Sequence, residues 1–227
     1  MLWVILIGGA GMVAGLVSLS MMIGERNRDR LLVASAKRAG LSFSPQDPFD
    51  CAGPPFDLFR QGDGRGTQNV MWRPNAEHPI RVFDYWWYDE YEDNNGVAHR
   101  SYHRRTCATA EVGWLWPQLS LTKEGLVSKA ASVLGVRDIE FESEEFNRTF
   151  YVTSEDRRFA NAFLDAQMID LLAATKGFVE IEVKNRWILL YTERLKGNEL
   201  PPLYKLTETI VARIPRLVYE MWPVSTR

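Results

Sequence analysis

An apolar run at the start of the chain, without a single charged side chain, is the feature that most constrains what this sequence can form. The run extends over residues 2–23. As a helix with a rise of 1.5 Å per residue it would be about 33 Å long, close to the roughly 30 Å hydrocarbon core of a bilayer. We therefore predict a transmembrane anchor over residues 1–24, a juxtamembrane helix over residues 25–40 and a soluble domain over residues 41–227.

A cleaved signal peptide is the alternative reading of the same run. Such a peptide has a basic segment before the apolar stretch and small residues at its cleavage site. Here no Lys or Arg precedes the run, and Met21, Met22 and Ile23 end it, although Ser18 and Ser20 are small. These flanks favour a retained single-pass span over a cleaved one.

The charges after the run predict the orientation of the chain. The basic residues here are Arg26, Arg28, Arg30, Lys37 and Arg38, against the acidic Glu25 and Asp29. The positive-inside rule then places the N-terminus outside and the domain in the cytoplasm, at the inner cell membrane. Gly11 and Gly15 have the spacing that lets two spans approach closely, which makes a homodimer an option.

The composition limits the classes of partner. Of the 227 residues, 46% are hydrophobic, enough for a sizeable core, and the net charge of −2 gives no basic field of the kind that nucleic acid binding needs. The two cysteines, Cys51 and Cys107, are too few for a disulfide scaffold, and a single bridge between them stays open. The expected partners are the lipid bilayer and an unknown protein or small ligand.

The pattern after the anchor predicts an α+β fold, with a mostly antiparallel sheet and helices packed on one side. A loop rich in proline and glycine covers residues 45–66, and Asn95-Gly96 is a strong hairpin signal between two strands. The other expected elements are strands over residues 70–72, 80–90, 97–112, 118–122, 138–142 and 146–153, a hairpin over 178–191, and helices over 124–134, 157–174 and 203–221 with a break at Pro215.

Two groups of residues could form ligand sites. His99, His103 and Cys107 are spaced by four, but on a strand four residues span about 13 Å, too far to share one metal ion. The glycines of residues 62–66, beside Arg60 and Arg65, could hold an anion, but the segment lacks the ending of a phosphate-binding loop. We favour exposed strand side chains and a flexible turn, and predict no metal and no cofactor.

The predicted strand over residues 80–90 carries the remaining candidates. Asp84, with an acidic run after it, could serve acid–base chemistry together with His99 or His103 if the hairpin brings them together. Trp86 and Trp87, between two tyrosines, must point to opposite faces of the sheet. One face is core, and the other is either a surface that stacks on a ligand or binds a partner or, as we favour, a surface covered by the loop or the last helix.

One block in the last third of the chain resembles a known family. Its residues are Phe146, Phe150, Val152, Ser154, Asp156, Ala160, Leu164, Met168 and Leu172. The block resembles a bacterial, actinobacterial-type family of single-pass membrane-anchored proteins of unknown function, mainly over residues 140–193. The resemblance implies the layout of a span followed by a strand–helix–hairpin domain, and it implies no activity.

These observations predict a function in binding rather than in catalysis. No nucleophile elbow, zinc-protease motif or dinucleotide fingerprint occurs in the chain. The prediction is a membrane-tethered cytoplasmic binding or scaffold domain. The alternative is a membrane-associated hydrolase that uses the carboxylates and histidines of residues 80–107.

Overall fold

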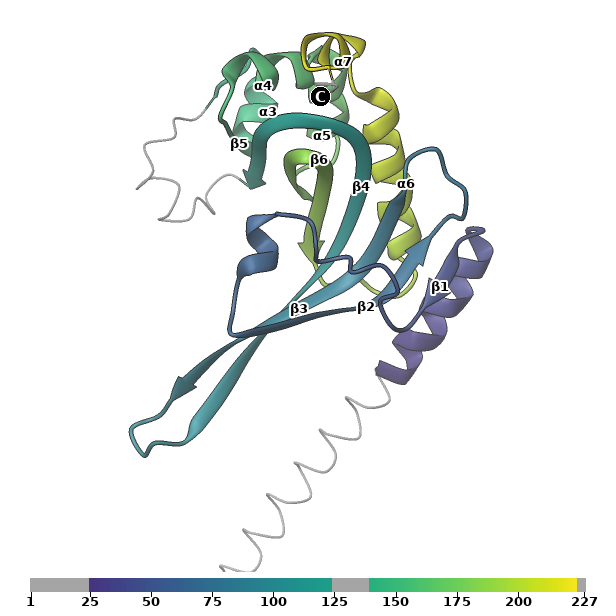
Figure 1. Ribbon diagram of the computed structural model, residues 1–227, viewed down its shortest axis with the longest axis vertical. Helices are drawn as coiled ribbons and strands as arrows, with labels where there is room; N and C mark the ends of the chain where they lie inside the picture. The colour runs from purple at the N-terminus through teal and green to yellow at the C-terminus, as the bar shows by residue number, and fades with distance from the viewer. Residues whose placement is uncertain (1–24, 124–138, 224–227) are drawn as a thin grey trace, which may run out of the picture.

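A six-stranded antiparallel sheet organises residues 25–123 and 139–223, the part of the chain that the computed structural model describes. Its strands are β1 (Ser42–Ser44), β2 (Gly64–Trp72), β3 (Ile80–Glu92), β4 (Ala98–Lys123), β5 (Phe150–Ser154) and β6 (Glu180–Glu193). They are ordered β1-β2-β3-β4-β5, and β6 pairs with the opposite edge of β4 (Figure 1). The structure is therefore α+β, as the sequence pattern predicted.

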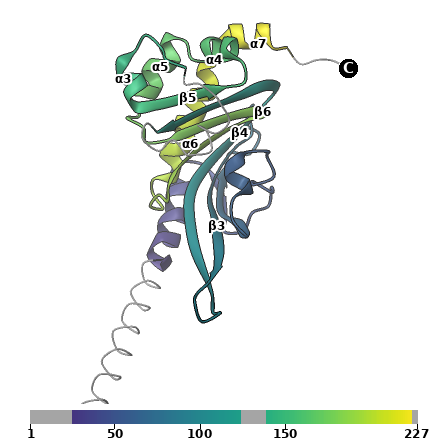
Figure 2. The same cartoon turned by 90° about the vertical axis from the view of Figure 1, so that its left-hand side faces the viewer.

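The α-helices cover one face of this sheet, and a long loop that contains a short 3-10 helix covers the other. The helical segments are residues 25–38, the 3-10 helix η1 (Asp57–Arg60), α3 (Glu144–Thr149), α4 (Arg157–Phe163), α5 (Ala166–Ala173), α6 (Leu200–Arg213) and α7 (Arg216–Met221). Figure 2 shows α6 and the helix over residues 25–38 on one side of the sheet, and the segment that carries η1 on the other. The sheet thus has a core on each face.

The two cores differ in size. The larger core joins helix residues such as Phe163 to alternate residues of the strands, among them Val82 and Leu121. The smaller core lies under the loop and contains Phe59, Tyr85 and other rings. Alternation along β3 explains the division, because neighbouring residues of a strand point to opposite faces.

β3 and β4 extend beyond the rest of the sheet as a two-stranded arm (Figure 1). Their register pairs Ile80 with Ala110 at the body and Glu92 with Ala98 at the tip. The Asp93 carboxylate accepts hydrogen bonds from the backbone of Asn95 and Val97, and Gly96 has a φ of 76°. The turn therefore forms where the Asn-Gly signal predicted it.

A sharp bend replaces several of the predicted breaks. β4 is one strand of 26 residues where the sequence predicted two, and β6 is one strand where it predicted a hairpin. Both strands bend together, at Gly113 with a φ of 75° and at Asn185 with a φ of 55°. Both halves of β6 pair with β4, and the register shifts at the bend, between Glu111 and Leu119 (Figure 1).

Side-chain caps explain two further differences. The predicted helix over residues 157–174 is divided into α4 and α5, because the Asp165 side chain accepts the Met168 N–H and starts a new helix. The predicted strand over residues 146–153 begins instead as α3, which the Ser143 side chain caps. The predicted break at Pro215 separates α6 from α7.

The predicted membrane span finds no counterpart in the described structure. Within residues 25–123 and 139–223, no helix is both long and apolar enough to cross a bilayer. The helix next to the predicted span carries Arg26, Arg28 and Arg30, and it ends before Gly40. This finding contradicts the predicted single-pass fold class and the predicted inner-membrane location. Residues 2–23 and the predicted helix over 124–134 lie outside the described residues.

Candidate functional site

A buried ion pair joins the helix over residues 25–38 to the sheet. The Arg28 guanidinium binds the Asp84 carboxylate through two hydrogen bonds of 2.7 and 2.8 Å, and the side chains are only 11% and 4% exposed. Asn69 Nδ2 and Thr106 Oγ1 donate to the same carboxylate at 2.9 and 3.2 Å. Asp84 therefore accepts four hydrogen bonds, which hold it as a structural anion rather than leaving it free as a base.

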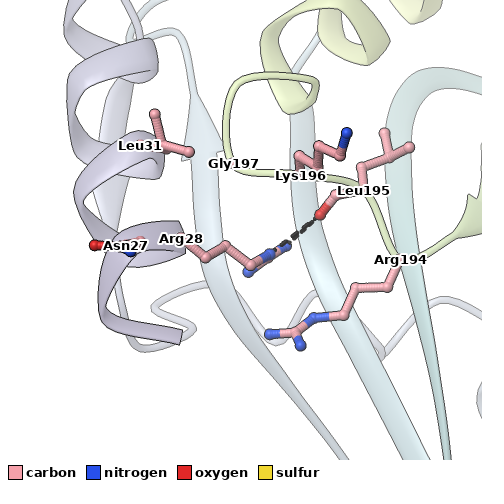
Figure 3. A pocket seen from close by; sticks show the side chains of 7 residues that line it. All are labelled: Asn27, Arg28, Leu31, Arg194, Leu195, Lys196 and Gly197. Carbon is pink, nitrogen blue, oxygen red and sulfur yellow. Dashed lines mark hydrogen bonds between the residues drawn. The ribbon is translucent and has the colours of Figure 1, made fainter. Parts of the chain in front are cut away.

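The same arginine fixes the chain that leaves β6. Arg28 Nε and Nη2 donate to the Leu195 carbonyl oxygen at 3.1 and 3.0 Å, and the Leu195 N–H donates to Thr106 Oγ1 at 2.9 Å. Figure 3 shows the pocket that forms between this turn and the helix, about 340 Å³ in volume. Its polar side chains are those of Asn27, Arg28, Arg194 and Lys196.

A second depression continues this surface onto the arm. It has a volume of about 520 Å³ and is lined by Tyr102, His103, Arg104, Arg105, Glu193 and Arg194. Arg194 lines both depressions, and its guanidinium pairs with Glu25 at 2.6 and 2.8 Å. This pairing lowers the pKa of Glu25, first through the hydrogen bond from Arg194, and raises the pKa of Arg194.

The four consecutive aromatic residues of β3 divide between the two faces as alternation requires. Tyr85 and Trp87 are buried in the smaller core under the loop. Trp86 and Tyr88 are half-buried on the opposite face, where their rings stack at 6.3 Å. The loop therefore covers Tyr85 and Trp87, as predicted for one face of the strand. Trp86 and Tyr88 belong to a surface that is partly open to solvent.

We call this open surface the aromatic–arginine face, defined by Trp86, Tyr88, Arg100, Tyr102 and Arg104. The Tyr102 ring packs against Trp86 and Tyr88 at 6.0 and 5.4 Å, and Arg100 lies over the Tyr88 ring at 4.5 Å. Tyr102 itself is 53% exposed. Stacked rings and guanidinium groups of this kind predominate among the residues that contribute most to protein interfaces.

Two glycines of β2 leave the space that the Tyr88 and Trp86 rings occupy. A Cβ atom on Gly64 would lie 2.4 Å from the Tyr88 ring, and one on Gly66 would lie 2.7 Å from the Trp86 ring. The register sets each glycine opposite its ring. The segment expected to be a flexible turn is thus the start of a strand, and its glycine spacing of two was the signal for a close approach.

The other predicted site residues are dispersed. His103 lies against Trp87 at 4.9 Å and contacts Asp89, and His99 contacts Asp93, each at 3.1 Å. Their parity on β4 sets both histidines on the face opposite Asp84, so the structure does not bring the predicted acid–base groups together. Within the described residues no group of His, Cys, Asp or Glu could hold a metal ion.

The remaining candidates have structural partners. The Arg65 side chain donates to the Phe59 carbonyl, and the Arg60 guanidinium lies 4.0 Å from Asp57 in an exposed pair. Cys51 and Cys107 are free and buried, and burial raises the pKa of both thiols. Such thiols are poor nucleophiles, because the reactive species is the thiolate.

Sequence reasoning missed the residues that build the site from the far ends of the chain. Arg28 was counted only as a charge beside the apolar run, and Arg104 and Arg194 were not singled out. Arg28 and Asp84 are 56 residues apart, and Arg28 and Leu195 are 167 apart. A charge pair at such separation leaves no local pattern in a single sequence, so only the structure identifies it.

A comparison with solved structures finds a similar fold. No family model matches the chain, and no curated protein matches it. The crystal structure of the mycobacterial trehalose monomycolate transport factor A, TtfA, is similar with a TM-score of 0.57 and 12% identity, over 89% of this chain and 99% of that chain. The likeness shows the fold, and its mycobacterial source agrees with the actinobacterial character of the resemblance. The family itself is not confirmed.

Proposed function

We propose that this chain is a non-enzymatic accessory domain that binds a protein partner through the aromatic–arginine face. The observation that carries the proposal is the character of that face. The strands β3 and β4 project from the body as an arm (Figure 1). On this arm Tyr102 and Arg104 are exposed, and the Tyr102 ring contacts the half-buried rings of Trp86 and Tyr88. Rigid aromatic rings next to arginines bind proteins at a low cost in side-chain entropy.

Two further observations support binding over catalysis. Asp84, the strongest acid–base candidate, is buried under four hydrogen bonds, and the histidines lie on the other face. The similar structure belongs to a protein described as a transport factor, and an accessory role of that kind is what we propose for this chain. A hydrolase would need these groups to converge on a pocket.

The test is affinity capture from the native host with the full-length protein. Tyr102→Ala removes an exposed ring from the aromatic–arginine face, and Phe178→Ala removes an exposed ring elsewhere, so the two variants are a matched pair. We expect the wild type and Phe178→Ala to retain the same partner and Tyr102→Ala to lose most of it. Equal retention by all three proteins would contradict the proposal.

A further inference from the structure

One edge of β4 is open along the arm. β6 pairs with β4 only from Arg105, which lies opposite Glu193, toward the body. From Ala98 to Arg104, β4 pairs with β3 on one side and with no described strand on the other. The depression of about 520 Å³ lies where β6 ends and β4 continues with β3 as its one described neighbour. A strand edge of this kind presents backbone donors and acceptors in a row.

Hydrogen bonds on the far side of β3 identify which residues face this edge. The Asp63 N–H donates to the Tyr88 carbonyl at 2.8 Å, and the Glu90 N–H donates to the Asp63 carboxylate at 2.7 Å. Tyr88 and Glu90 therefore direct their backbone groups toward β2 and away from β4. In an antiparallel ladder the residue opposite does the reverse. Tyr102 lies opposite Tyr88 and Arg100 opposite Glu90, so both direct N–H and C=O to the open edge.

Arg104 belongs to the same set and adds a charge. It lies opposite Trp86, two residues from Tyr102, and its carbonyl oxygen accepts a bond of 3.2 Å from the Arg105 side chain on the open side. Arg105 and Arg194 pair with Glu193 and Glu25. No described carboxylate forms an ion pair with the Arg104 guanidinium, which is exposed at the same depression.

We propose that the edge of β4 over residues 98–104 binds an extended acidic segment of a protein partner by β-strand addition. The proposal rests on the proposed function and names its mode of binding. Backbone groups of Arg100, Tyr102 and Arg104 bond the added strand, and side chains alternate between the two faces of the arm. On the aromatic–arginine face an acidic side chain pairs with Arg104 and its neighbour two residues away packs on the Tyr102 ring. The Arg104 charge, which no described carboxylate pairs, selects against basic segments.

The experiment uses the full-length protein and a fluorescein-labelled peptide of nine residues, Glu-Thr-Val-Thr-Glu-Thr-Val-Thr-Glu, in which Glu and Val alternate along one face of the extended chain. Matching peptides carry Lys in place of Glu, or N-methyl groups on alternate backbone nitrogens in either phase. Arg104→Ala removes the charge, whereas Arg104→Pro also removes one backbone donor that β3 does not use, a substitution that edge strands tolerate. Arg216→Ala removes an exposed arginine far from the edge and is the charge-matched control.

We expect the acidic peptide to bind the wild type and Arg216→Ala equally, and the Lys peptide not to bind. Arg104→Pro should bind roughly tenfold more weakly than Arg104→Ala, because it loses a hydrogen bond and gains a clash with the added strand. One phase of N-methylation should abolish binding and the other should not. The N-methylation test uses the wild-type protein, so it does not depend on whether Arg104→Pro folds.

Three results would overturn strand addition: no binding of the acidic peptide, equal binding of the Lys peptide, or no effect of N-methylation in either phase. The native partner separates this failure from that of the proposed function. A partner lost by Tyr102→Ala but retained alike by Arg104→Pro and Arg104→Ala would overturn strand addition alone. A partner indifferent to Tyr102→Ala would overturn the proposed function itself.

Discussion

The ion pair of Arg28 and Asp84 shows how much one buried contact can decide. Asp84→Ala would leave the Arg28 charge buried without its partner, and such a loss costs about 3–5 kcal/mol of unfolding free energy. Urea unfolding followed by circular dichroism measures this cost. Glu144→Ala, which breaks an exposed pair with Arg148, should cost less than about 1 kcal/mol. Similar costs for both variants would show that the buried pair does not hold the helix to the sheet.

Glu182 is a second residue whose environment sets a measurable property. It is 8% exposed, one carboxylate oxygen has no partner among the described residues, and burial raises its pKa to about 7. The unfolded chain releases this proton near pH 4.5, so stability falls as the pH rises from 4.5 to 7. Glu182→Gln should therefore stabilise the protein by about 3 kcal/mol at pH 8 and by little at pH 4.5.

Thermal or urea unfolding across this pH range tests the prediction for Glu182. Glu220→Gln, at an exposed position in α7, is the control and should behave alike at both pH values. A gain from Glu182→Gln that does not change with pH would mean that the carboxyl group is not protonated in the folded protein.

Among the elements, those with a local signal could be predicted and those set by distant contacts could not. The arm was foreseen because Asn95-Gly96 specifies its turn, and the break at Pro215 because proline lacks a donor. The continuous bend of β4 and β6 was not predicted, because Lys184, Asn185 and Arg186 have the composition of an ordinary hairpin turn. Likewise the acid–base pairing of Asp84 with a histidine depended on strand parity, which a sequence leaves open until the register is known.

The bend gives a prediction about backbone conformation. Asn185 is exposed with a φ of 55°, a region in which a Cβ atom costs about 1 kcal/mol for residues other than Gly, Asn and Asp. Asn185→Ala should therefore lower the unfolding free energy by about 1 kcal/mol, and Asn185→Gly should be close to neutral. Equal losses in both variants would assign the effect to the amide side chain instead of the backbone.

On the scale of the whole molecule, the sheet separates two cores that differ in how many helices and strands they include. The larger core contains residues of every described α-helix and of all strands except β1, whereas the smaller one joins the loop to the middle strands. The aromatic–arginine face lies on the same side of the sheet as the larger core. On the opposite side of the arm, Tyr85 and Trp87 pack in the smaller core. The arm is thus held in place from both sides.

This division predicts two kinds of unfolding. Phe59→Ala removes a ring that packs on Tyr85 at 4.9 Å in the smaller core, and Phe163→Ala removes one from the larger core. Each truncation costs about 3–5 kcal/mol where it acts. Because cooperative units can open separately, hydrogen exchange should accelerate mainly over residues 45–63 in Phe59→Ala and throughout β4, β6 and α6 in Phe163→Ala. Hydrogen exchange with mass spectrometry resolves these segments. Acceleration over the whole sheet in both variants would mean that the two cores unfold as one unit, and that the loop is as necessary to the sheet as the helices are.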